Sequence, residues 1–160
     1  MSKRAVITGA GIVSCLGNDI ESVANALKEQ RSGIIYNDIY KERGLKCHVS
    51  GGISIDVSQY LDKKSMRFMG NAAAYGTIAM MNAIEGSGLD SNLVSNRRTG
   101  LVVGSGGISA ETMYEEFKAY EKKGAKGVNP FLLFKTMSNT SSASLSSFFK
   151  VETSNFISAD

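Results

Sequence analysis

The chain has 160 residues, of which 42% are hydrophobic and 21% charged, and its formal net charge at pH 7 is +3. This is an ordinary globular mixture with enough residues for one packed core, and so small a charge does not by itself argue for a nucleic-acid partner. The two cysteines predict no disulfide framework, no apolar run is long enough for a membrane span, and the first apolar run breaks at Gly9, unlike a signal peptide. We therefore expect a soluble, cytoplasmic protein.

The beginning of the chain predicts a strand, a glycine turn and then a helix. Val6 and Ile7 start an apolar run of the kind that forms a buried strand, and the backbone can turn tightly or take a positive φ at Gly9 and Gly11. Asn18 is the candidate N-cap of a helix that begins near residue 19. This order of elements is typical of the opening of an α/β fold.

The glycine turn has a second interpretation, as a dinucleotide-binding loop. Such a loop needs the pattern Gly-x-Gly-x-x-Gly, in which the third glycine lets the helix and the strand pack closely. Ser14 stands at that third position, and no acidic residue closes a second strand at the expected distance. The sequence therefore gives a nucleotide site little support, and titration with NAD would test it.

The middle of the chain predicts two helices separated by an insertion. Over residues 19–30, apolar side chains recur at helical spacing on one face. Residues 34–58 are irregular, with short alternating pieces, and predict loops and small strands. Over residues 64–86, methionines and alanines follow helical spacing, which indicates a helix that another element can approach closely. Gly86 and Gly88 are expected to end this helix.

The remaining residues predict two strands with two helices between them. A buried strand at residues 100–104 leads into the glycine-rich loop Gly104–Gly107, and such loops are where α/β proteins place ligands. The helices are predicted at residues 109–121 and 131–149, and a last strand is predicted at residues 155–159.

A run of small polar residues, 138–147, lies within the last of these helices. By composition the run could be a flexible linker. The flanking side chains of Met137 and Phe148, with Leu145 inside the run, favour a buried helix that packs closely against a neighbour. Between the two helices, residues 124–129 predict a mobile loop.

The sequence holds no convincing nucleophile. Cys47 is next to His48, the single histidine, but adjacent residues of a strand point to opposite faces and make a poor catalytic pair. Cys15 has no base near it in the sequence. We therefore expect both thiols to be packed or incidental, and we expect no metal and no cofactor.

Five motifs, in order along the chain, resemble β-ketoacyl-acyl carrier protein synthases, the condensing enzymes of fatty-acid synthesis. They are Val6–Ser14, Leu61–Met69, Gly100–Gly107, Asn129–Phe131 and Lys150–Ala159. Residues such as Phe134–Met137 are similar to the first type of these synthases. The resemblance implies an α/β, thiolase-like fold with α-β-α layers and a mainly parallel sheet, incomplete at its carboxyl end. Residues 1–160 would then form the amino-terminal half of a synthase domain whose second half is absent.

The resemblance also implies an activity for the intact protein, which is acyl-chain elongation by decarboxylative Claisen condensation of an acyl-enzyme with malonyl-acyl carrier protein. The family's nucleophilic cysteine would follow within a few residues of Asp160, and its two histidines and a lysine would come later. We therefore expect no catalytic residue in this chain and no activity from it alone. An alternative is a non-catalytic chain-length partner of a ketosynthase, which lacks the cysteine.

A basic cluster near the start of the second helix is the first candidate binding site. Lys63, Lys64 and Arg67 stand where a helix dipole disfavours cations, so an outside anion would stabilise them. In the family that the chain resembles, matching positions dock the acidic helix of acyl carrier protein, and Lys126 is a further candidate. A solvated charged face is the alternative. Weaker candidates are Lys122 and Lys123.

The resemblance implies an acyl-chain pocket as the second site. Ile108 follows the glycine loop at a position where family members line the pocket, and its branched side chain would restrict the chain more than glycine would. Met137 resembles another pocket-lining position, and Phe131 is implied to reach the pocket of a partner subunit. Core packing is the alternative for all three residues. The resemblance further implies a homodimer.

Overall fold

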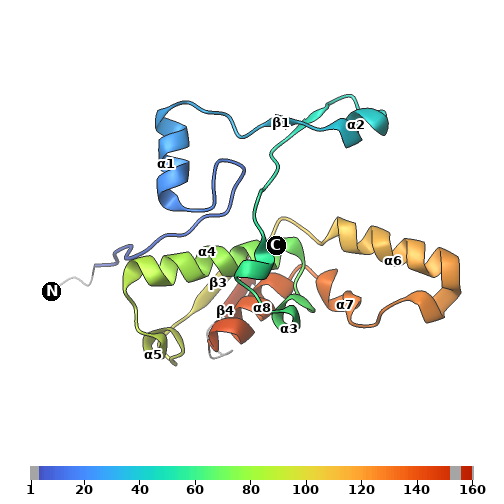
Figure 1. Cartoon of the computed structure of the whole chain (residues 1–160). Helices are drawn as coiled ribbons and strands as arrows, with labels where there is room; N and C mark the ends of the chain where they lie inside the picture. The colour runs from blue at the N-terminus through green and yellow to red at the C-terminus, as the bar shows by residue number, and fades with distance from the viewer. Residues whose placement is uncertain (1–3, 152–155, 160) are drawn as a thin grey trace. The chain divides into compact units, whose positions relative to one another are not determined.

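The computed structural model describes residues 4–151 and the backbone of residues 156–159. The chain forms two compact units. Unit 1 comprises Met1–Asp56 and Ile78–Gly88, and unit 2 comprises Val57–Thr77 and Leu89–Asp160. The long helix α4, Asn71–Ser87, therefore contributes residues to both units (Figure 1).

The predicted strand at the start of the chain is wrong. Val6 and Ile7 belong to no strand, and their side chains are 76% and 93% exposed. A strand is stable only when a second backbone completes its hydrogen bonds, and an apolar run does not specify where that backbone lies. The structure places residues 4–13 in an unpaired, irregular segment.

Gly9 and Gly11 have a different role from the one that the sequence suggests. Neither has a positive φ. A Cβ atom at Gly9 would lie 2.2 Å from the carbonyl oxygen of Ala83, and one at Gly11 would lie 1.8 Å from that of Ala79. Both carbonyls belong to the backbone of α4, so no side-chain movement can relieve the clash. Glycine is needed here because the chain passes directly against α4.

The first helix, α1, covers Ile20–Lys28 and confirms the prediction for residues 19–30. Its N-cap is Asp19 rather than Asn18, because the Asp19 carboxylate accepts hydrogen bonds from the Ser22 amide at 2.7 Å and the Ser22 hydroxyl at 2.6 Å. The Asn18 side chain donates instead to the Ser54 carbonyl oxygen at 2.8 Å. Only Val23 and Ala26 of α1 are buried.

The insertion after α1 consists of loops and small strands, as predicted. Strands β1, Ile35–Tyr36, and β2, Val49–Ser50, pair in antiparallel orientation, with Ile35 opposite Ser50. The short helix α2, Asp38–Glu42, was not predicted; the Asn37 side chain caps it by accepting from the Tyr40 amide at 3.3 Å.

The helix predicted at residues 64–86 is interrupted. A 3-10 turn, η1, at Val57–Gln59 precedes the short helix α3, Lys63–Met66, and α4 begins only at Asn71. Gly70 lies in the break, where a Cβ atom would lie 3.3 Å from the Ser109 Cβ atom. The break therefore brings the start of α4 close to a distant segment of unit 2. At the other end, Gly88 has a φ of +66° and follows the last residue of α4, as expected of a helix-ending glycine.

Both predicted strands of the second half are confirmed. Strand β3, Leu101–Gly104, pairs in parallel with β4, Phe156–Ala159, with Leu101 opposite Phe156. The short helix α5, Ser91–Val94, which was not predicted, precedes β3. Leu101 is buried, but Val102 is 73% exposed, so only one face of β3 is covered.

Helices follow β3, and two details differ from expectation. Helix α6, Ala110–Lys123, confirms the helix predicted at residues 109–121, while the loop predicted after it contains a 3-10 turn, η2, at Gly124–Gly127. The predicted helix 131–149 is split into α7, Leu132–Lys135, and α8, Thr140–Phe149. The Thr140 hydroxyl donates to the Phe134 carbonyl oxygen across this break.

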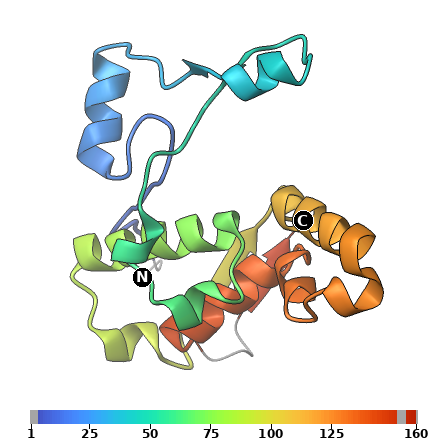
Figure 2. The same ribbon diagram turned by 45° about the vertical axis from the view of Figure 1, so that its right-hand side comes forward.

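The serine-rich run forms a buried helix rather than a linker, as predicted. Helix α8 lies against β3 and β4 (Figures 1 and 2). Ser142 and Ser146 are buried, and their hydroxyls donate to the carbonyl oxygens of Asn139 at 2.9 Å and Val151 at 3.0 Å. Small side chains whose polar atoms are satisfied within the backbone permit close packing.

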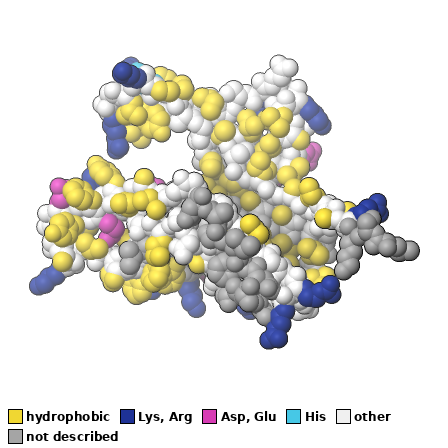
Figure 3. Space-filling view, turned by 180° about the vertical axis from the view of Figure 1, so that it is seen from behind, with side chains coloured by type: hydrophobic (Ala, Val, Ile, Leu, Met, Phe, Trp, Pro, Cys, Tyr) yellow, Lys and Arg dark blue, Asp and Glu magenta, His cyan; other side chains and the backbone are white. Residues whose placement is uncertain are grey.

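Many large hydrophobic side chains remain exposed across the part of the chain that the structure describes, and Figure 3 shows several groups of them on one face. Among the described residues, no helix is both long enough and apolar enough to cross a bilayer.

We predict that Gly11→Ala destabilises the protein by about 1–3 kcal/mol, because the added methyl group meets the α4 backbone. Gly86→Ala is the matched control. A Cβ atom at Gly86, within α4, meets nothing within 4 Å, so alanine there should be neutral or stabilise by about 0.5–1 kcal/mol. Urea unfolding followed by circular dichroism measures both. Equal stability of the two variants would contradict the close approach at Gly11.

We also predict that Asp19 titrates below its ordinary pKa of 3.8, because the Ser22 hydroxyl and then the Ser22 amide donate to its carboxylate. Since the folded pKa is lowered, this cap stabilises the protein above the unfolded pKa, and the contribution is lost as the pH falls through the folded value. Carboxyl-carbon NMR should show the Asp19 pKa rising toward 3.8 in Ser22→Ala. The pKa of Asp62, lowered chiefly by the Ser65 amide, should not change in that variant.

Candidate functional site

A pocket of about 270 Å³ lies within unit 2. Three segments form it: the break before α4 and the first turn of that helix, the loop after β3 with the start of α6, and the connection from α7 to α8. Its lining residues are Gly70, Asn71, Ala72, Ala73, Gly107, Ile108, Ser109, Ala110, Glu111, Lys135, Met137, Thr140 and Ser141. The glycine loop after β3 therefore does border a cavity, the position that the sequence singled out.

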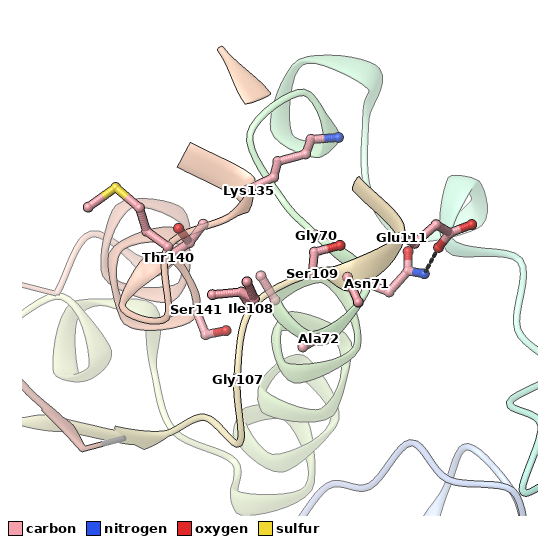
Figure 4. Close-up of a pocket in the computed structure, with 13 residues that line it drawn as sticks. Gly70, Asn71, Ala72, Gly107, Ile108, Ser109, Glu111, Lys135, Thr140 and Ser141 are labelled. Atoms are coloured by element: carbon pink, nitrogen blue, oxygen red, sulfur yellow. Dashed lines mark hydrogen bonds between the residues drawn. The ribbon is translucent and has the colours of Figure 1, made fainter. Parts of the chain in front are cut away.

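Two residues predicted for an acyl pocket, Ile108 and Met137, line this cavity together. Their side chains are 47% and 44% exposed, so they are available to a ligand rather than fully packed. Figure 4 shows Ile108 directed toward the α8 residues Thr140 and Ser141. Glycine and alanine supply much of the remaining wall, which leaves room beside these two apolar side chains.

The charged groups of the pocket lie away from its apolar part. Figure 4 shows the side chains of Lys135 and Glu111 directed away from Ile108. The Glu111 carboxylate accepts a hydrogen bond from the side-chain nitrogen Nδ2 of Asn71 at 3.0 Å, which joins the first turn of α6 to the first turn of α4. An apolar chain could therefore lie along Ile108 without removing a charge from water.

Ser109 joins two walls of the pocket. As the N-cap of α6, its side chain accepts from the Thr112 amide at 3.4 Å, and its hydroxyl lies 2.9 Å from that of Thr112. Gly70 allows this side chain to approach the break before α4. Ile108 directly precedes Ser109, so the capping contacts of Ser109 fix the backbone that carries Ile108.

Phe131, the third predicted pocket residue, does not line this cavity. Its ring lies edge-on to Phe68, with centroids 5.8 Å apart, and Phe68 also contacts Phe134 at 6.2 Å. The guanidinium carbon of Arg67 lies 4.9 Å from the centre of the Phe131 ring. The structure therefore brings together a predicted docking cation and a predicted pocket residue, in an aromatic cluster whose rings are partly exposed.

The predicted docking lysines are exposed. Lys63 and Lys64 lie on α3, and Lys126 lies in η2. The Asp62 carboxylate caps α3 by accepting from the Ser65 amide at 2.6 Å, and this bond lowers the pKa of Asp62. A local anion thus already occupies the start of α3. The cations at the start of α3 therefore need an outside anion less than the sequence suggested.

Neither cysteine has the surroundings of a nucleophile paired with a base. The Cys47 thiol lies 3.8 Å from the Val49 carbonyl oxygen, while the His48 ring packs edge-on to Tyr36 at 6.0 Å. Cys15 is half-buried, and its sulfur lies 2.8 Å from where a Cβ atom at Gly33 would be. Within the described residues, no three His, Cys, Asp or Glu side chains come together in a way that could hold a metal ion.

Sequence reasoning missed most of the pocket wall. The residues in the break before α4 and at the starts of α4 and α8 have no motif of their own, because their place in the wall depends on the two helix breaks. Those residues are Gly70, Asn71, Ala72, Ala73, Thr140 and Ser141. The glycine loop after a strand was the one available signal.

Comparison with known proteins assigns the family. Residues 2–158 match the family model described as the amino-terminal domain of β-ketoacyl synthase. The chain is 41% identical over 155 residues to 3-oxoacyl-[acyl-carrier-protein] synthase 1 of Haemophilus influenzae, covering 96% of this chain. It spans only 38% of the length of that relative.

Solved structures show the same fold. The ishigamide ketosynthase/chain length factor matches with a TM-score of 0.83 at 18% identity, covering 96% of this chain and 39% of that one. AntDE:AntF, a type II PKS acyl-carrier protein in complex with its ketosynthase, matches with a TM-score of 0.73 at 25% identity, covering 94% of this chain and 40% of that one. The chain therefore belongs to the β-ketoacyl synthase family and has its α/β, thiolase-like fold.

Proposed function

We propose that the whole protein elongates acyl chains in fatty-acid biosynthesis, as a 3-oxoacyl-acyl carrier protein synthase, and that residues 1–160 form the amino-terminal half of its catalytic domain. The observation that carries this proposal is the family match over residues 2–158, together with the names of the relatives. The chain spans 38% of the length of the Haemophilus influenzae relative, which supports the proposal that residues 1–160 form only part of the catalytic domain.

The proposed reaction has two stages. A cysteine thiolate attacks the carbonyl carbon of an acyl thioester, and the carrier thiol leaves as the acyl group moves to the enzyme. Malonyl-acyl carrier protein then loses CO₂, and the resulting carbanion attacks the acyl-enzyme carbonyl. The new carbon–carbon bond forms as the carbon–sulfur bond breaks, which restores the thiolate. The cysteine is not among the described thiols, so the proposed contribution of this chain is recognition rather than bond making.

The pocket in unit 2 is proposed to hold the acyl chain. Ile108 and Met137 supply apolar, partly exposed surface, and the small residues around them leave space. Burial of an acyl chain there gains about 0.8 kcal/mol per methylene group. Phe131, which lies outside this cavity, is proposed to line the pocket of a second subunit.

The exposed cations Lys63, Lys64 and Arg67, with Lys126, are proposed to dock acyl carrier protein. The AntDE structure is a complex of a ketosynthase with such a carrier protein, which supports this choice of partner. Exposed positive charge speeds the encounter with an acidic partner and orients it. Arg67 would also hold the Phe131 ring at the edge of the docking surface.

We further propose that the protein is a homodimer. A second candidate function is that of a non-catalytic chain-length partner, which the fold shared with a ketosynthase/chain length factor favours. The two functions differ in one step, because only the condensing enzyme takes the acyl group onto a thiol.

We expect the whole protein to take up acyl groups from acyl carrier protein and to release CO₂ from the malonyl form. Ile108→Ala should shift acyl uptake toward longer chains, by about fourfold for each added methylene that the larger pocket can bury. Val128→Ala, an exposed apolar position outside the pocket, is the control. Mass spectrometry of the acyl-enzyme across chain lengths is the measurement.

Three outcomes of that experiment separate the proposals. Absence of both uptake and CO₂ release contradicts the condensing function. Binding of acyl carrier protein without uptake supports the chain-length partner instead. Uptake with the same length preference in the Ile108 and Val128 variants contradicts the assignment of the pocket.

We predict that reversing the two α3 lysines, with Lys63→Glu and Lys64→Glu together, weakens binding of acyl carrier protein about tenfold or more. The matched control reverses Lys41 and Lys46, two exposed lysines of the insertion in unit 1. Calorimetric titration at low and high salt measures both, and the wild-type affinity should fall with salt. Equal losses in the two double variants would indicate a general charge effect and contradict a docking site on α3.

A further inference from the structure

The charged group of Arg67 rests on an aromatic ring. Its guanidinium carbon lies over the Phe131 ring, 4.9 Å from the ring centre, and a cation in that position is attracted by the negative face of the ring. Among the residues that the structure describes, the Arg67 guanidinium forms no ion pair with Asp or Glu. The Arg67 side chain is exposed, so its N–H donors remain available to a partner.

The Phe131 ring is itself fixed by its neighbours. The Phe131 amide donates to the Asn129 side-chain oxygen at 3.0 Å. The Asn129 amide in turn donates to the Glu116 carboxylate of α6 at 2.9 Å. On the other side, the Phe68 ring lies edge-on to the Phe131 ring, with centroids 5.8 Å apart and an interplanar angle of 76°. The guanidinium of Arg67 therefore lies on a support that two distant segments hold in place.

A guanidinium that is held in one position binds a carboxylate better than a free one does. Its N–H groups lie in one plane and match the two oxygens of a carboxylate, whereas the ammonium group of lysine acts as a point charge. Binding normally removes rotamer freedom from a long side chain, and a support that has already restricted the side chain lowers that cost. An aromatic ring beneath Arg67 can thus strengthen a contact that the ring does not itself make.

We propose that Phe131 is a positioning residue of the carrier-docking surface, and that its ring holds the Arg67 guanidinium ready to bind one carboxylate of acyl carrier protein at two points. The inference rests on the proposed docking function, and it gives the docking cations different roles. Lys63 and Lys64 attract the acidic partner and speed the encounter. Arg67 makes the fixed, directional contact.

A neighbouring ring separates this role from simple packing. Phe134 also lies edge-on to Phe68, with centroids 6.2 Å apart. Among the described contacts between cations and rings, Arg67 lies over Phe131 and not over Phe134. The two phenylalanines therefore share one packing partner and differ in the cation, which makes Phe134 the matched control.

Calorimetric titration of the whole protein with acyl carrier protein tests the positioning role. Phe131→Leu keeps an apolar side chain but removes the aromatic face, so it should weaken binding about two- to fivefold. Phe131→Tyr keeps the face and should retain the wild-type affinity. Phe134→Leu makes the same change in the ring that does not face Arg67, and it should also leave the affinity unchanged.

A change that conserves charge tests the two-point contact. Arg67→Lys removes the planar set of donors from an exposed position, so the affinity should fall while its dependence on salt stays that of the wild type. In the Arg67→Lys background, Phe131→Leu should have little further effect, because no planar group remains to be positioned. Equal losses from Phe131→Leu in the two backgrounds would show that the ring does not act through Arg67, and would overturn the proposal.

The remaining outcomes separate this inference from the proposed function. A wild type that does not bind acyl carrier protein overturns both. Wild-type binding that Phe131→Leu leaves unchanged, or that Phe131→Leu and Phe134→Leu weaken equally, retains the docking surface and overturns the positioning role. A changed acyl-chain preference in Phe131→Leu with unchanged carrier affinity overturns it in favour of the pocket of a second subunit. Arg67→Lys with wild-type affinity overturns the two-point contact, whatever the Phe131 variants do.

Discussion

The close approach of other segments to α4 is the constraint on which much of the structure depends. In unit 1, the chain at Gly9 and Gly11 passes so near the α4 backbone that no side chain fits between them. In unit 2, the Leu145 side chain lies against α4 beside Gly76, where a Cβ atom would make an ordinary van der Waals contact with it at 3.8 Å. Thr77 is fully buried, and its hydroxyl is satisfied inside the helix by the Ala73 carbonyl oxygen at 2.8 Å. Since the first turn of α4 also forms a pocket wall, the packing of this helix shapes the site.

Apolar spacing in the sequence predicted where helices lie better than where they stop. The predicted helix at residues 64–86 breaks at Gly70, which lies beside Ser109. The predicted helix at residues 131–149 breaks between Phe134 and Thr140, where the Thr140 hydroxyl donates a hydrogen bond to the Phe134 carbonyl oxygen. Ser109 is far from Gly70 in the sequence, so the spacing of apolar residues within one helix could not predict that contact. The failed strand at the start of the chain has a similar cause, since strand pairing is also a long-range property.

The same distinction holds for the candidate site. A glycine loop after a strand and the residue following it, Ile108, could be singled out from local pattern and family resemblance. Met137 lies far from Ile108 in the sequence, yet the two line one cavity. The wall made by Gly70 and Asn71 could not be predicted, because it exists only through the break before α4. The capping of α3 by Asp62 was not predicted, and its consequence for the two lysines that follow required the observed hydrogen bond.

The parallel pair of β3 and β4 has a consequence for how the protein is made. Residue 156 pairs with residue 101, so about 55 further residues must be synthesised after β3 begins before its partner strand exists. At about 5–20 residues per second, a ribosome takes about 3–11 s to synthesise them. During that interval β3 offers an open edge, and α6 to α8 can form before the sheet does, because helices need only local contacts. The helices of unit 2 would thus be a scaffold that receives β4, rather than a layer added to a finished sheet.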